Sequence, residues 1–245
     1  MTNDAMTTFH LEICAGNLAS ALAAQRAGAH RIELCSGLDA GGLTPSAGLI
    51  RAAVASLSIP VHVLIRPREG DFCYSPEELA VMCDDIRLCR EFGAAGVVVG
   101  ALDEQGNLDT AAMQAMLRAA EGLHVTCHRA FDFVLDPVSA LEQLIGWGMG
   151  RVLSSGQATT AYEGRFMLKK LVEQAAGRIA VMPGAGISPQ NIGEIRAVTG
   201  ATDFHMTGRR KVTRTLPGQE ITGLAWEHWE SDEGKISSAL LLCAT

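Results

Sequence analysis

The chain has 245 residues, 48% of them hydrophobic and 19% charged, with 26 glycines, 8 prolines and a formal net charge of −7. This composition excludes an intrinsically disordered chain, and the length allows two small domains or one α/β barrel. The acidic balance and the lack of a basic block argue against a nucleic-acid partner or an anionic membrane surface.

The cysteines and the start of the chain indicate the cellular compartment. Seven cysteines fall at positions 14, 35, 73, 83, 89, 127 and 243, without a Cys-x-x-Cys pair. This odd number and spacing disfavour a disulfide framework or a structural zinc ribbon. The first residues, MTNDAMTTFH, lack the regions of a signal peptide, and no apolar run is long enough to span a bilayer. We therefore predict a cytoplasmic protein without a membrane partner.

Short β-rich stretches alternate with helical patterns along the chain. The predicted strands cover residues 9–14, 31–35, 61–67, 96–102, 124–127, 151–156, 179–186 and 203–208. The predicted helices cover residues 18–28, 47–57, 75–93, 109–122, 136–148, 166–176 and 188–200, and an apolar segment at 236–243 follows. Ser75, Pro76 and Glu78 match a capping box, which marks a helix start.

Strict alternation of strands and helices implies a parallel sheet with right-handed crossovers, and eight such units fit a closed barrel. A doubly wound open sheet is the alternative, but the first turn, CAGNLAS, lacks the glycine pattern of a dinucleotide site. No composition shift marks a second domain. We predict an α/β fold, a single-domain (β/α)8 TIM barrel over residues 9–245 after a tail at 1–8, with no organic cofactor.

In such a barrel, two-residue alternation directs a set of side chains inward near the carboxyl ends of the strands. This inward set contains Glu12, Cys14, Glu33, Cys35, His62, Leu64, Arg66, Thr126, His128, His205 and Thr207. The fifth strand continues into Arg129 and Asp132, and the third loop adds Arg68. Barrel interiors otherwise contain branched apolar residues, so buried Glu12 and Glu33 require partners or a ligand.

The sequence is compatible with three interpretations of this cluster. The candidate catalytic residues are Glu12, Glu33, Arg66, His128 and His205. Neighbouring carboxylates and histidines can exchange protons when burial and repulsion separate their pKa values. Alternatively, Glu33, His128 and His205 could hold a hard divalent ion. The third interpretation is a ring of mutually satisfied polar residues that closes the barrel.

A second candidate site follows the last two predicted strands, where the chain reads PGAGIS and TGRR. Barrels often bind phosphate there, through backbone N–H groups of a glycine-rich turn and a helix start. The candidate anion-binding residues are Arg68, Gly184, Gly186, Thr207, Gly208 and Arg209. Glycine-rich turns also arise for purely steric reasons.

Cys14 and Cys35 form a possible soft metal site. They lie on adjacent predicted strands at matching heights, and paired thiolates suit a monovalent ion such as Cu(I). The alternative is that both pack as small apolar side chains, because free cysteine is among the most buried residue types.

Several motifs together resemble the CutC family of copper homeostasis proteins. They are FHLEICA, RIELCSG followed by GGLTPS, IRPREGDFCYS, VTCHRAFD, RVLSSG, VMPGAGI and FHMTGR, from Phe9 to Arg209. The resemblance implies a cytoplasmic (β/α)8 barrel that binds copper and forms a homo-oligomer, a dimer or a tetramer. It also implies Cys14 and Cys35 as Cu(I) ligands. The chain departs from the family after Arg209, where it reads KVTRTLPGQEITGLAWEHW.

Two hypotheses for the function follow. The first is a copper homeostasis protein that binds Cu(I) at Cys14 and Cys35. The second is a TIM-barrel enzyme that acts on a small phosphorylated or carboxylated metabolite at the barrel mouth. In that case Arg66, Arg68 and Arg209 would bind the anion, and Glu33 and His128 would exchange protons.

Overall fold

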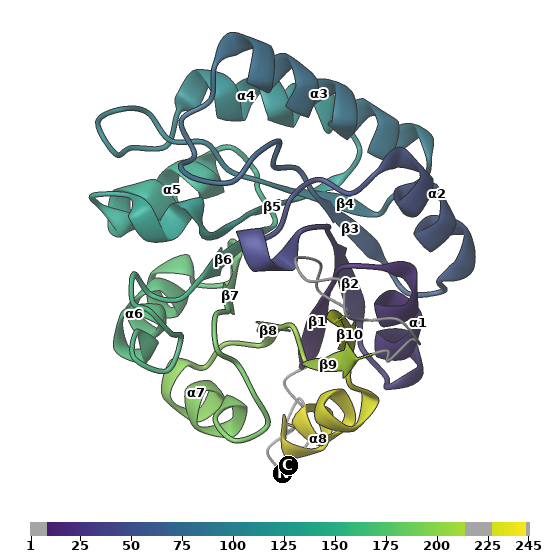
Figure 1. Cartoon of the computed structure of the whole chain (residues 1–245). Helices are drawn as coiled ribbons and strands as arrows, with labels where there is room; N and C mark the ends of the chain where they lie inside the picture. The colour runs from purple at the N-terminus through teal and green to yellow at the C-terminus, as the bar shows by residue number, and fades with distance from the viewer. Residues whose placement is uncertain (1–8, 214–226, 244–245) are drawn as a thin grey trace.

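Eight parallel strands alternate with helices around a barrel (Figure 1). In this computed structural model, residues 9–213 and 227–243 are described. The barrel strands are β1 (His10–Ala15), β2 (Arg31–Leu34), β3 (Val61–Leu64), β4 (Gly96–Val99), β5 (His124–Cys127), β6 (Arg151–Ser154), β7 (Ala180–Pro183) and β8 (Asp203–Met206). The predicted tail at 1–8 lies outside the described residues.

Helices surround this sheet and make the outer layer of the barrel (Figure 1). They are α1 (Leu18–Arg26), α2 (Ala47–Ser56), α3 (Pro76–Glu91), α4 (Thr110–Ala119), α5 (Pro137–Gly146), α6 (Arg165–Ala175), α7 (Ile192–Thr199) and α8 (Glu233–Cys243). Two short 3₁₀ helices lie in the loops, η1 (Leu38–Ala40) and η2 (Arg129–Phe133). The predicted apolar segment 236–243 forms most of α8.

The strands pair in the order β7-β6-β5-β4-β3-β2-β1-β8, and β7 contacts β8 where the two ends of this series meet. Every pairing within the sheet is parallel. The predicted (β/α)8 barrel is therefore confirmed. β1 lies between β2 and β8, with Cys14 opposite Glu33 and Glu12 opposite His205.

The helix starts follow from local sequence. Ser75 Oγ accepts a hydrogen bond from the Glu78 N–H, and Glu78 Oε2 accepts one from the Ser75 N–H. This is the predicted capping box, with Pro76 in the first turn of α3. At α1, Asn17 Oδ1 accepts from the Ser20 N–H at 2.8 Å. Such caps satisfy N–H groups that have no partner within the helix.

The apolar core lies between the strands and the helices. Leu11, Ile13, Ile32 and Leu34 are fully buried there. The residues that alternate with them on β1 and β2, such as Glu12 and Glu33, belong to the other face of the sheet, inside the barrel. Period-two alternation thus separates a hydrophobic outer face from a polar interior.

The end of the chain differs from the prediction. β9 (Arg209–Thr213) and β10 (Glu227–Ser231) form an antiparallel pair outside the barrel. β10 packs against the start of α1, because Asn17 Nδ2 donates to the Trp229 carbonyl and the Ser231 N–H donates to Ser20 Oγ. The barrel strands are also shorter than predicted, since the residues after Leu64 and Val99 enter the loops at the barrel mouth.

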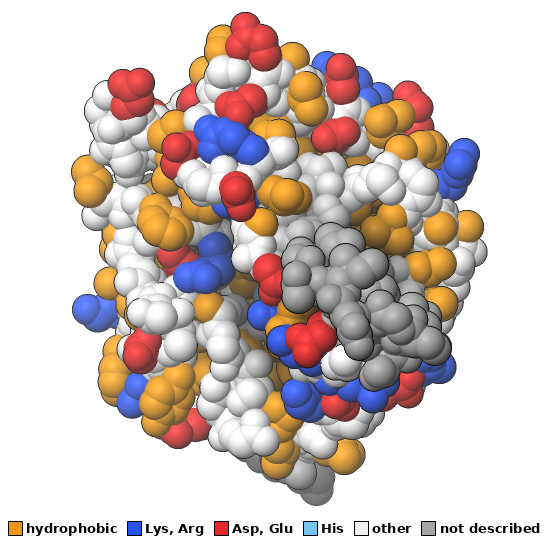
Figure 2. All heavy atoms as spheres, viewed as in Figure 1, with side chains coloured by type: hydrophobic (Ala, Val, Ile, Leu, Met, Phe, Trp, Pro, Cys, Tyr) orange, Lys and Arg blue, Asp and Glu red, His pale blue; other side chains and the backbone are white. Residues whose placement is uncertain are grey.

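Figure 2 shows acidic and basic side chains interspersed on the face viewed in Figure 1. Among residues 9–213 and 227–243, the helices are too short or too polar for any of them to cross a membrane.

Candidate functional site

Four charged residues pair inside the barrel, mostly near the amino ends of its strands. We call Glu12, Arg31, Arg151 and Asp203 the lower network; each is at most 8% exposed. Asp203 Oδ1 accepts hydrogen bonds from Arg31 Nη2 and Arg151 Nε, both at 3.2 Å. Glu12 Oε2 accepts one from Arg31 Nε. Every charge of the lower network therefore has an opposite charge in direct contact.

His205 connects this network to the barrel mouth. Its Nδ1 lies 2.9 Å from Glu12 Oε1, and its Nε2 lies 3.7 Å from Glu33 Oε2. Burial would raise the pKa of Glu12, but the hydrogen bond with His205 and the charge of Arg31 hold it well below its ordinary value. The ionised Glu12 therefore accepts a hydrogen bond from Nδ1–H of His205.

The two carboxyl groups beside His205 have pKa values shifted in opposite directions, with that of Glu12 lowered and that of Glu33 raised. Burial would lower the pKa of His205, but the charges of Glu33 and Glu12 raise it above its ordinary value. Burial raises the pKa of Glu33, and the charge of Glu12 adds to this, although His205 opposes it. Glu33 and His205 are thus adjacent groups with raised pKa values, and a proton can pass between them.

The two cysteines of the inward set lie together. Cys14 Sγ is 3.4 Å from Cys35 Sγ, and the two residues are 6% and 0% exposed. Hydrogen bonding with Cys35, together with burial, raises the pKa of the Cys14 thiol well above its ordinary value. Cys14 is therefore protonated at neutral pH, and a metal that binds it must displace that proton.

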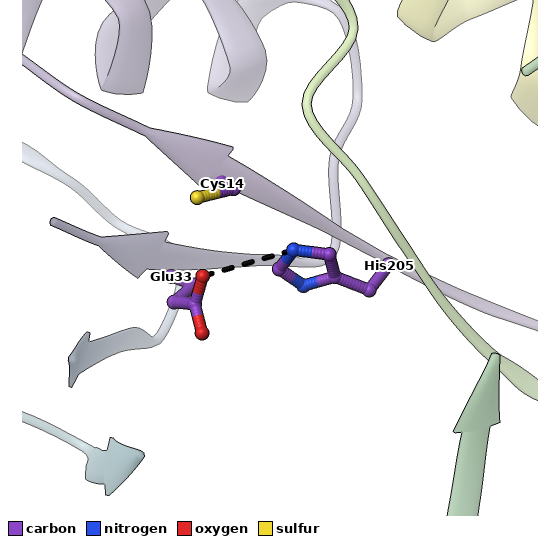
Figure 3. Close-up of side chains that lie close together, drawn as sticks. All are labelled: Cys14, Glu33 and His205. Carbon is purple, nitrogen blue, oxygen red and sulfur yellow. Dashed lines mark ion pairs between the residues drawn. The ribbon is translucent and has the colours of Figure 1, made fainter. Parts of the chain in front are cut away.

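Cys14 also lies beside Glu33 and His205. One ligand atom from each of these three residues lies within 4.8 Å of the others. Figure 3 shows the three side chains close together, with Glu33 and His205 facing each other. The sequence predicted a divalent-ion set of Glu33, His128 and His205; in the structure the third residue of the compact cluster is Cys14.

A cavity of about 260 Å³ lies at the carboxyl ends of the strands. Its polar lining includes Cys14, Glu33, Arg66, His128, Arg129, Gly186, His205 and Thr207. Its apolar lining includes Leu38, Leu64, Phe72, Leu153 and Ile187. Many predicted site residues therefore do meet around one hollow, at the end of the barrel where barrel enzymes carry their active sites.

His128 lines this cavity and carries a buried hydrogen-bond donor. Its Nδ1 accepts a hydrogen bond from the Ala130 N–H at 3.1 Å. Burial, with the charge of Arg66, lowers the pKa of His128 to about 3, so the ring is neutral and carries its proton on Nε2. That Nε2 is buried and has no hydrogen-bond partner among the described residues.

Arg66 lines the cavity but also holds two loops. Its guanidinium donates to the carbonyls of Ala40 and Gly42 in the loop after β2, and to that of Gly70 in the loop after β3. The group also lies over the Phe72 ring, 5.1 Å from its centroid. Arg66 therefore shapes the cavity wall as well as contributing positive charge.

Arg129 and Asp132 connect two neighbouring loops. Asp132 Oδ2 accepts from Arg129 Nε at 2.8 Å, and Asp132 Oδ1 accepts from Ser154 Oγ at 2.6 Å. The Ser155 N–H and hydroxyl also donate to this carboxylate. The pair thus fixes η2 against the end of β6, which holds Arg129 at the cavity wall.

Several predicted anion-binding residues lie apart from the cavity. Arg68 pairs with Asp71 and Glu78, and Arg209 pairs with Asp39 and lies over the Trp229 ring. A Cβ added at Gly184 would meet the Leu153 side chain at 2.4 Å, and Gly208 has a φ of +52°. Steric and conformational needs account for these two glycines.

Sequence reasoning missed the partners below the mouth. Arg31 and Asp203 each precede an inward-facing residue, Glu33 and His205, by two positions, so the same alternation places them inside the barrel. Arg151 is the first residue of β6 and had no such neighbour in the predicted set. The two-residue alternation could therefore have identified Arg31 and Asp203, but not Arg151.

A family model described as the CutC family matches residues 9–210. A CutC family protein of Xylella fastidiosa (strain 9a5c) is 47% identical over 234 residues, which cover 95% of this chain and 88% of that protein. The "Copper homeostasis protein cutC homolog" of Homo sapiens is 50% identical over 201 residues, 82% of this chain and 74% of the human protein.

The Xylella match spans 234 residues and therefore continues beyond Arg209, whereas the family model ends at residue 210. The solved structure of a Streptococcus agalactiae protein described as CutC has a TM-score of 0.78 and 35% identity, covering 82% of this chain and 99% of that one. Phosphoribosyl anthranilate isomerase from Thermotoga maritima, at 13% identity and a TM-score of 0.55, shares the fold alone, over 96% of this chain and 98% of its own.

Proposed function

The chain belongs to the CutC family, and from this premise we propose that it binds Cu(I) through Cys14 and Cys35 as part of copper homeostasis. The observation that carries the proposal is the 3.4 Å separation of the two buried sulfur atoms. Soft thiolate ligands select Cu(I) over hard ions. The name of the human relative supports the same role.

Anaerobic titration with Cu(I) against a competing chelator tests this proposal. We expect tight binding of one ion per chain, which a Cys14→Ser, Cys35→Ser double variant loses. Because the pKa of Cys14 is raised, binding releases a proton, so the apparent affinity should increase with pH. Retained binding in the double variant would refute the proposal.

A matched control removes two other buried thiols. Cys83 and Cys89 of α3 are unpaired and 7% and 0% exposed, and they lie outside the barrel interior. The Cys83→Ser, Cys89→Ser double variant should bind Cu(I) as the unchanged protein does. If both double variants lose Cu(I) binding equally, general destabilisation and not the loss of two ligands explains the result.

A second candidate function is an enzyme that acts on a small phosphorylated or carboxylated metabolite. The observation that favours it is the cavity, which brings Arg66, Arg129 and the free Nε2–H of His128 to one hollow beside Glu33 and His205. The two arginines and His128 would bind the anion, and Glu33 and His205 would exchange protons.

A screen of small phosphorylated and carboxylated metabolites by thermal shift tests this second candidate. A true substrate should raise the melting temperature, and His128→Ala should reduce that shift because the donor to the anion is lost. If the metabolite raises the melting temperature of His128→Ala and of Glu33→Gln as much as that of the unchanged protein, it binds elsewhere, and the candidate function is contradicted.

Location and assembly complete the proposal. The six cysteines in the described part of the chain are unpaired, which supports a reducing, cytoplasmic compartment.

Exposed Phe133, Leu135 and Val138 lie close together in the sequence at η2 and the start of α5 and support a homo-oligomer. Light scattering on the purified protein would reveal a dimer or tetramer, and a monomer at all concentrations would contradict this part.

A further inference from the structure

Cys14, Glu33 and His205 converge on the cavity from three adjacent strands, β1, β2 and β8 (Figure 3). Their ligand atoms lie within 4.8 Å of one another, and His205 Nε2 is 3.7 Å from Glu33 Oε2. Ligands bonded to a tetrahedral zinc ion lie roughly 3.3 to 3.8 Å from each other. We propose that these three residues form a site for a zinc-class divalent cation.

The donor set separates this site from the copper site. A thiolate, a carboxylate and an imidazole are all ordinary zinc ligands, whereas Cu(I) prefers sulfur alone. The two sites share Cys14 but differ in every other ligand. The inference therefore does not depend on Cu(I) binding, since Cys35 takes no part in the divalent site.

The orientation of His205 supports metal binding. Glu12 Oε1 lies 2.9 Å from His205 Nδ1, which leaves Nε2 directed toward Glu33 and Cys14. Glu12 is itself held by Arg31. Histidines that bind metals almost always donate their other ring N–H to a carboxylate or carbonyl, which fixes the tautomer and the ring plane. Glu12 is in the position to do this.

Three protein ligands leave a fourth coordination position. All three residues line the cavity, so this position faces the hollow rather than the core. His128, only 5% exposed, also lines the cavity, and its Nε2 has no partner among the described residues. A side chain with an unused hydrogen-bond donor therefore lies at the same hollow as the open coordination position. Zinc sites with three protein ligands and one open position are typical of catalysis.

Zinc titration of the full-length, metal-free protein tests the site, with a chromophoric chelator as competitor. We expect one Zn(II) per chain. Co(II), used as a spectroscopic probe, should give a thiolate-to-metal charge-transfer band that Cys14→Ser abolishes. A wild-type protein that binds no Zn(II), or a Co(II) spectrum without that band, would overturn the proposal.

Single substitutions then identify the ligands. Glu33→Gln and His205→Asn should each weaken Zn(II) binding by more than about 100-fold, and Glu12→Gln by about 10- to 100-fold. Cys35→Ser should retain Zn(II) binding while it removes Cu(I) binding, so the two proposals fail independently. Circular dichroism checks folding; if His205→Asn does not fold, the nearly isosteric Glu33→Gln decides, and unchanged affinity in that variant overturns the site.

Discussion

The barrel interior contains two clusters of buried charge that differ in how fully their members are paired. In the lower network, Arg31 and Arg151 each contact Asp203, and Arg31 also contacts Glu12. At the mouth, by contrast, Glu33 Oε2 lies 3.7 Å from His205 Nε2, and His128 Nε2 has no partner among the described residues. A cavity adjoins the mouth residues.

This difference separates charges that pair with one another from charges whose contacts a ligand could complete. A buried ion pair is costly to desolvate, and removal of one member leaves the other without compensation. Groups that are buried without full pairing are also costly, unless a bound ion or molecule completes their contacts. The lower network should therefore control stability, and the mouth should control binding.

The largest expected effect comes from the lower network. Asp203→Asn leaves two buried guanidinium groups without their shared carboxylate, so we expect a loss of about 3 to 5 kcal/mol in the free energy of unfolding, measured with urea. The control is Glu233→Gln, which breaks an exposed pair with Arg26 and should cost less than about 1 kcal/mol. Equal losses in the two variants would remove the distinction between the regions.

A smaller effect concerns two buried histidines. Burial lowers the pKa of His62 to about 3, and that of His128 to about 3. Between these values and the ordinary 6.5, the unfolded chain binds protons that the folded chain does not. The unfolding free energy therefore falls as pH decreases through this range, by about 2 kcal/mol per histidine at pH 5.

Unfolding curves at several pH values check this dependence. His62→Gln should flatten the decrease in stability between neutral pH and pH 5, because one group that resists protonation is removed. Replacement of the exposed His228 by Gln serves as the control. A slope that His62→Gln leaves unchanged would show that other groups cause the acid sensitivity.

The smallest expected change in stability is at the mouth. Glu33→Gln replaces a buried carboxyl whose pKa burial has raised with a neutral group of nearly the same shape. We expect a change of less than about 1 kcal/mol in the free energy of unfolding, together with loss of zinc binding. A loss as large as that of Asp203→Asn would show that Glu33 belongs functionally to the lower network.

The barrel was predictable because local signals repeat. Each strand and helix carries its own pattern, and the capping box at Ser75 marks one helix start without any tertiary information. Alternation also showed which residues share a face of each strand, and the inward face was chosen for Glu12, Glu33 and His205 because the charged residues fall together on it. These features depend on neighbours within a few residues, which a sequence displays directly.

The details of the site depend on distant neighbours. Which inward residues meet is set by strand register, such as Glu12 opposite His205, and register is a property of the closed sheet. Arg68 and Arg209 follow strand ends in the sequence, yet carboxylates in nearby loops pair with them instead. The β9–β10 pair, Arg209–Thr213 with Glu227–Ser231, consists of largely exposed residues with no clear alternation.

The position of Cys14 between Cys35 and the Glu33–His205 pair has a thermodynamic consequence. Both proposed sites need the Sγ atom of Cys14, and two cations on that one sulfur would repel each other, so Cu(I) and Zn(II) would compete. Linkage then requires that each ion weaken the apparent binding of the other in proportion to its own free concentration. The barrel would thus respond to the ratio of the two metals rather than to the amount of either.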